Sequence, residues 1–232
     1  MKVQSMPVRS FRKLWHVGTM DILLKRRGSH EGTGLSVSTE PEAWKQINKG
    51  HTAGPTWELT KAGNQFLNMH SLSARSRKRI ADWGIAHRLV KASALYRYEY
   101  RDDELDDTVY SDFPTRIEAE NEASAPEEVT EVQGLIATSK LLLRVSEDSL
   151  SPVMVPDFLA TLFAEQELKI DGVWWQDILD PLAYSAPRGV IFKLHVQHVE
   201  QSPGRAARPR WVAAATCTYN PTCILLNHSC NP

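Results

Sequence analysis

The chain has 232 residues, enough to bury a substantial core, and its formal net charge of −1 does not single out a strongly charged partner. Hydrophobic residues make up 42% and charged residues 24%, which excludes wholesale disorder, and no run of about 18 apolar residues predicts a membrane span. The three cysteines all lie between Cys217 and Cys230, and the first twelve residues lack the apolar core of a secretory signal. We therefore expect a single cytoplasmic domain over residues 1–232, with no membrane partner.

The first third of the chain predicts short strands and one well-marked helix. Thr39 precedes Pro41 and lies next to acidic residues, a pattern typical of a helix start, so a helix is expected to about Asn48. Apolar residues alternating with polar ones and bounded by turn residues predict the strands. These strands cover residues 13–17, 35–38, 56–59 and 64–68.

Residues 71–83 predict a helix with an excess of positive charge. Four cations on it cannot all share one face, namely Arg75, Arg77, Lys78 and Arg79. Surface charges of this kind are normally solvated, and contact with a phosphate or a nucleic acid is the alternative.

Residues 102–128 are strongly acidic. They contain eleven acids against the single base Arg116, which predicts an exposed loop or insertion. Four of the aspartates are close in sequence, but they lack the glycine and the spacing of a calcium loop, so no metal site is expected.

Apolar residues at helical intervals predict helices over residues 127–145 and 155–166, the second with a proline in its first turn. Two strands are expected after them, over 173–175 and 189–196. Trp174 and Trp175 are adjacent and should point to opposite faces of their strand.

The stretch Leu14-Trp15-His16-Val17-Gly18-Thr19 carries the most informative motif in the first half. It resembles the "L-[WY]-H-G-[ST]" opening strand of ADP-ribosyltransferases of the diphtheria-toxin and poly-ADP-ribose-polymerase type, with Val17 inserted. Gly34-Leu35-Ser36-Val37-Ser38 resembles the strand that these enzymes place soon afterwards, although no tyrosine follows Gly34. The resemblance implies an α+β fold with an ADP-ribosyltransferase-like split antiparallel sheet and flanking helices.

The resemblance also implies a function, the transfer of ADP-ribose from NAD to a macromolecular acceptor, protein or nucleic acid, in a toxin or defence protein. It implies that His16 takes part in catalysis and that a late acid stabilises an oxocarbenium-like state. We expect this acid to be Asp177, with Asp171 and Asp180 as alternatives. The remaining residues expected to bind NAD are Gly18, Thr19, Ser36, Ser38, Trp44 and Arg188, the last through the pyrophosphate. The expected cleft requires the strands of His16 and Trp174 to lie side by side.

Two other interpretations remain open. Leu225–Pro232 resembles the N-H-S-C-x-P signature of SET-domain lysine methyltransferases, and Gly32-Thr33-Gly34-Leu35 resembles their early strand, which would imply a fragment that binds S-adenosylmethionine. A non-catalytic binding module is the third possibility. The late cysteines and His228 do not have the spacing of a typical zinc site, and the chain has neither a G-x-G-x-x-G motif nor a P-loop motif.

Overall fold

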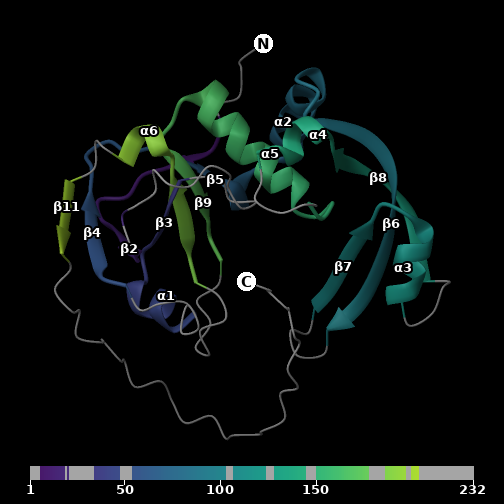
Figure 1. The fold of residues 1–232 in the computed structure, drawn as a ribbon, viewed down its shortest axis with the longest axis horizontal. Coiled ribbons are helices and arrows are strands. Elements are labelled where there is room, and N and C mark those ends of the chain that lie inside the picture. The colour runs from purple at the N-terminus through teal and green to yellow at the C-terminus, as the bar shows by residue number, and fades with distance from the viewer. Residues whose placement is uncertain are drawn as a thin grey trace, which may run out of the picture.

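The computed structural model of the chain describes residues 6–18, 20, 34–47, 54–102, 107–123, 128–144, 150–177, 186–196 and 200–203. Within these ranges the protein combines helices with largely antiparallel sheets, which agrees with the α+β class. Figure 1 shows a curled larger sheet on one side, a smaller sheet on the other, and helices α2 (Ala74–Ala86) and α5 (Val155–Phe163) between them.

The larger sheet is built from eight short strands. They are β1 (Val8–Arg9), β2 (Leu14–Val17), β3 (Leu35–Ser38), β4 (Thr56–Thr60), β5 (Phe66–Asn68), β9 (Gly172–Trp175), β10 (Arg188–Ile191) and β11 (Glu200–Pro203). Their spatial order is β1-β5-β9-β10-β3-β2-β4-β11, and only the pair of β5 and β9 is parallel. The strands predicted in the first third of the chain are thus confirmed within two residues. Strands β4 and β5, predicted around one turn, lie in different parts of the sheet.

A single residue pair joins β2 to β3. Trp15 is in register with Ser38, whereas four residue pairs join β3 to β10 and four join β2 to β4. The strand pairing is therefore shortest between β2 and β3, where two groups of strands with longer pairing meet.

Two hydrophobic clusters cover the two faces of this sheet. One cluster contains Trp174, and the other contains Trp175 together with most of α5. Both indoles are buried, with 1% and 6% of their surface exposed. The prediction that they point to opposite faces is confirmed, as the alternation of side chains along a strand requires.

Helix α2 connects the two sheets. The side chain of Ser73 caps its start by accepting a hydrogen bond from the backbone N–H of Ser76, and the helix packs against α5. Gly84 allows this close packing, because a Cβ on Gly84 would lie 2.6 Å from the Leu159 side chain. The helices predicted over 71–83 and 155–166 are thus confirmed, the second continuing as a π-helical turn (Ala164–Leu168). Helix α1 (Pro41–Ile47) follows β3 as predicted.

The smaller sheet contains β6 (Val90–Asp102), β7 (Asp107–Phe113) and β8 (Val129–Ala137), with β6 in the centre. Helix α3 (Arg116–Glu122) lies against this sheet at its outer side (Figure 1). Its start has a capping box, in which Thr115 and Glu118 exchange hydrogen bonds between side chain and backbone.

Two predictions for this region are wrong. Residues 102–128 are not a loop, since they contain β7 and α3, and whether the segment is an insertion stays a prediction. Residues 127–145 do not form one helix, since they contain β8 followed by the single turn α4 (Ser139–Leu142). The apolar spacing suited a helix, but nine residues of this segment pair with the thirteen-residue strand β6. Such a distant pairing partner decides the structure of a segment with an ambiguous local pattern.

The strand predicted over 189–196 is correct only for its first three residues. Strand β10 ends at Ile191, and the short helix α6 (Lys193–Val196) follows it. No helix in the described part of the chain is long and apolar enough to cross a membrane.

Candidate functional site

The expected site residues fall into two groups within the larger sheet. Trp15 shares a register position with Ser38, and Ser38 with Arg188, so these three side chains lie on one face. His16 follows Trp15 in the same strand and therefore points to the opposite face. The two faces of the sheet thus separate His16 from Ser38 and Arg188.

His16 lies at the end of β2 and is buried, with 8% of its surface exposed. Its Nδ1 is 2.7 Å from the backbone oxygen of Ser36. Because a carbonyl oxygen can only accept, Nδ1 donates in this hydrogen bond. A Cβ on Gly18 would lie 3.3 Å from Nε2, so the ring folds back over this glycine at the strand end.

Gly18 has a clear structural role. Its φ of 130° is a conformation that favours glycine, and its backbone N–H donates to the oxygen of Pro55 at 3.0 Å. Its own oxygen accepts a hydrogen bond from the indole N–H of Trp57 at 3.0 Å. A Cβ on Gly54 would lie 2.6 Å from the Gly18 Cα, so the two glycines let these segments touch. Contact of Gly18 with NAD stays a prediction.

The second group lies where β9 ends and β10 begins. The Nε of Arg188 donates to a carboxylate oxygen of Asp177 at 2.7 Å, and the Arg188 guanidinium lies 5.3 Å from the centre of the Trp175 ring. The indole N–H of Trp175 donates in turn to Asp157 of α5 at 2.9 Å. Two carboxylates, one guanidinium and one indole therefore form a continuous network.

The pKa values of Asp177 and Arg188 in this network are shifted from their ordinary values. Burial raises the pKa of Asp177, and the nearby carboxylate of Asp157 raises it further, while the contact with Arg188 acts in the opposite direction. Burial also lowers the pKa of the Arg188 guanidinium, which stays protonated at neutral pH. Groups with perturbed pKa values in one cluster are typical of functional sites.

Ser38 supports this network from β3. Its hydroxyl donates to the backbone oxygen of Pro187 at 2.6 Å and accepts from the backbone N–H of Glu40 at 2.9 Å, and the residue is fully buried. The hydroxyl therefore fixes the residue before Arg188 and the entry into α1. Trp44 lies half-buried on α1, and the described hydrogen bonds do not connect its side chain to either group. Thr19 lies outside the described residues.

Asp171, an alternative late acid, serves the fold. It is 8% exposed and accepts hydrogen bonds from the Lys61 ammonium and from the backbone N–H of Gln65, and it lies 3.0 Å from Nδ1 of His195. Burial alone would raise its pKa. The hydrogen bonds from Lys61 and Gln65 and the charges of Lys61 and His195 outweigh burial, so the pKa lies below its ordinary value. Asp180, the other alternative, lies outside the described residues.

The strands of His16 and Trp174 belong to the same sheet, but they are not side by side. β10 and β3 separate β9 from β2. Neither Trp57, which holds Gly18, nor Asp157, which binds Trp175, was among the expected site residues. Asp157 stands in the first turn of a predicted helix, where an acid is ordinary, so its sequence position gave no signal.

The sequence features behind the SET-like interpretation fall mostly outside the described residues, including the whole segment 225–232. Gly34 is described, and its lack of a side chain is explained by packing, because a Cβ would lie 2.2 Å from the backbone oxygen of Ile191. No group of three or more metal-ligating side chains occurs among the described residues.

No protein-family model, curated protein or solved structure matches this chain.

Proposed function

We propose that this chain transfers ADP-ribose from NAD to a macromolecular acceptor, protein or nucleic acid. One observation carries the proposal. Ser38, Asp177 and Arg188 were each expected at an NAD site. Asp177 and Arg188 form an ion pair, and Ser38, from the distant strand β3, lies in register with Arg188 and bonds to the residue before it.

The side chains of this group fit the parts of NAD. A guanidinium can bind the pyrophosphate through several hydrogen bonds, and a carboxylate can bind ribose hydroxyls. Trp15 lies in the same row, half-buried, and offers an aromatic surface on which a ring can stack. The Trp175 ring is not available in this way, because it is buried beneath Arg188.

The reaction breaks the bond between C1′ of the nicotinamide ribose and the nicotinamide nitrogen, and the electron pair leaves with neutral nicotinamide. Asp177 then stabilises the positive charge that develops on the ribose in the oxocarbenium-like state. A nucleophile of the acceptor bonds to C1′ and releases its proton to solvent. Arg188 orients the Asp177 carboxylate through Nε and contributes positive charge for the pyrophosphate.

His16 would act from the opposite face of the sheet, at the end of β2. Its ring lies at the end of β2 beside Gly18, where it could contact the nicotinamide ribose. This role requires NAD to reach around the strand end, because His16 and Arg188 lie on opposite faces.

The direct test is nicotinamide release from NAD, measured by chromatography on the purified chain. Asp177→Asn keeps the shape of the side chain and should lower the rate on the order of 100-fold, the usual effect of removing one electrostatic stabiliser. Asp82→Asn, on the exposed side of α2, is the matched control and should leave the rate unchanged. Equal rates in the wild type and in Asp177→Asn would overturn the proposed site. An unchanged rate in His16→Ala would overturn only the role proposed for His16.

A ligand that binds only the native state must raise the melting temperature. NAD should therefore raise it and S-adenosylmethionine should not. The reverse result would favour the SET-like alternative, and no shift with either compound would favour a non-catalytic binding module.

If the acceptor is essential to the cell, the chain would act as a toxin or defence protein. Induced expression of the wild type should then arrest growth in a host that lacks an antidote, and expression of Asp177→Asn should not.

A further inference from the structure

The surface around α2 carries a concentrated positive charge. Residues 69–98 contain one acid, Asp82, against seven cations, which are Arg75, Arg77, Lys78, Arg79, Arg88, Lys91 and Arg97. Arg97 lies further along β6 and pairs with Asp112. The other six surround α2 and the start of β6, and this set is called the α2 surface below.

Most of the α2 surface is not neutralised by the protein itself. Lys78 pairs with Asp82, and Arg77 donates to a backbone oxygen of Met69. Within the described part of the chain, Arg75, Arg79, Arg88 and Lys91 make no ion pair with an acid, and all four are exposed. Ordinary protein surfaces mix charges of both signs, so four unpaired cations on neighbouring elements are unusual.

Few acidic side chains near the α2 surface could neutralise its positive charge. The π-helical turn that packs beside α2 contributes Glu165 and Glu167, and Glu167 accepts a hydrogen bond from the indole N–H of Trp83. The charge of the surface therefore remains positive after its surroundings are included.

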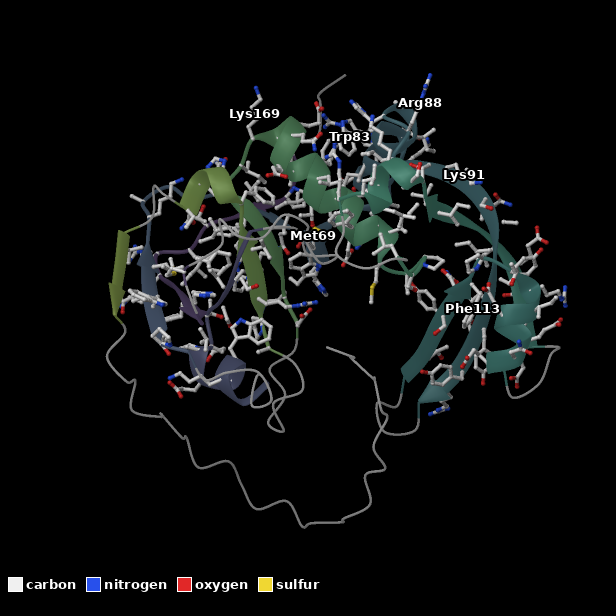
Figure 2. All side chains as sticks on the ribbon, viewed as in Figure 1. Met69, Trp83, Arg88, Lys91, Phe113 and Lys169 are labelled. Carbon is white, nitrogen blue, oxygen red and sulfur yellow. The ribbon has the colours of Figure 1, made fainter. Side chains whose placement is uncertain are left out.

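The elements that carry these cations are packed against the rest of the protein. Helix α2 packs on α5, and Arg79 lies over the ring of Phe163 with its guanidinium 5.4 Å from the ring centre. At the other end, Lys140 donates to the backbone oxygen of His87, and the backbone of Thr138 bonds to Leu89. Figure 2 shows Trp83, Arg88 and Lys91 along one edge of the molecule, the upper edge in this view.

The geometry points to the α2 surface as a binding site for the phosphate backbone of double-stranded DNA. A 13-residue helix is about 20 Å long, a span over which a duplex presents several phosphates on each strand. A single strand is the weaker candidate, because its binding depends on aromatic rings that stack on bases. The rings of Trp83 and His87 on this surface contact each other in a tilted arrangement, with ring centres 4.7 Å apart, so neither offers a free face between them.

This inference does not depend on the NAD chemistry, because DNA binding is measured without NAD. If both proposals hold, DNA is the first acceptor to test.

The test is fluorescence anisotropy of a labelled 20-base-pair duplex with the purified chain at a series of salt concentrations. Four phosphate contacts predict a slope of log K against log salt of about −3.6, which weakens binding roughly 150-fold between 50 and 200 mM salt. Arg75→Gln combined with Arg88→Gln should reduce the slope to about −1.8, and the loss over the same range to roughly 12-fold.

A matched control removes two cations elsewhere. Lys13→Gln combined with Arg116→Gln makes the same change in net charge at two exposed ion pairs and should keep the wild-type slope. An equal loss of slope in both double variants would overturn the inference, since only net charge would then matter. Tighter binding of a 20-nucleotide single strand, or binding to phosphatidylserine vesicles without binding to the duplex, would also overturn it.

Discussion

Replacing Asp171 by asparagine should destabilise the fold more than any comparable change on the surface. The carboxylate connects three segments, because it binds Lys61 after β4, the Gln65 backbone before β5, and His195 of α6. It stands at the start of β9, the strand that ends beside Asp177. Loss of its charge therefore loosens the anchor of the strand that positions the candidate site.

The expected cost follows from these contacts. A hydrogen bond to a charged group contributes about 1.5–3 kcal/mol, and removing one partner of a buried ion pair costs about 3–5 kcal/mol. The side chains of Lys61 and His195 are 23% and 28% exposed, so solvent relieves part of the cost. We expect Asp171→Asn to lower the free energy of unfolding by about 2–4 kcal/mol at pH 7.

The measurement is urea denaturation followed by tryptophan fluorescence. Asp82→Asn removes an exposed ion pair with Lys78 and should cost at most about 1 kcal/mol. Since the pKa of Asp171 is lowered in the folded state, its contribution is complete above the unfolded value of about 3.9 and disappears as pH falls through the lower folded value. The difference between the wild type and Asp171→Asn should thus be constant from pH 7 to 5 and shrink below about pH 4. A variant as stable as Asp82→Asn, or a gap that shrinks already near pH 6, would refute this reasoning.

Three further predictions concern the site and its strands. Gly34→Ala should lower the melting temperature strongly, because the added Cβ would overlap backbone atoms. Gly63→Ala is the control, since a Cβ at Gly63 meets nothing within 4 Å. It should cost only the roughly 1–2 kcal/mol of strain of a left-handed backbone conformation. Trp175→Phe removes the indole hydrogen bond to the Asp157 carboxylate and should lower the free energy of unfolding in denaturant by about 1–3 kcal/mol. An unchanged free energy of unfolding would mean that water replaces the indole. The rate of nicotinamide release should fall as pH drops through the raised pKa of Asp177. The residual rate of Asp177→Asn should not show this fall at acidic pH. The same fall in both proteins would assign the titration to another group.

Local chemistry was sufficient to predict much of the larger sheet. The strands β2 and β3, the start of α1 and the opposite directions of Trp174 and Trp175 all follow from alternation, capping and turn residues close in sequence. The smaller sheet was not predictable in this way. The segment that forms β8 has apolar residues that also suit a helix, and only pairing with β6 selects the strand.

The candidate site shows the same division. The sequence suggested Asp177 and Arg188 separately, but their contact could not be inferred, because it depends on the register of β10 against β9. The inclusion of Asp157 depends on how α5 lies against β9. The separation of His16 from Arg188 also required the register of three strands. It depends on the pair of Trp15 and Ser38, which joins the two groups of strands.

The central claim is most directly tested by incubating the chain with NAD labelled in its adenine and with macromolecular acceptors, both protein and DNA. Acid-insoluble label should accumulate with the wild type, together with an equal or larger amount of nicotinamide, and Asp177→Asn should lower both on the order of 100-fold. Incorporation of label that is the same for the wild type and Asp177→Asn would contradict the account, and so would the absence of both products with the wild type.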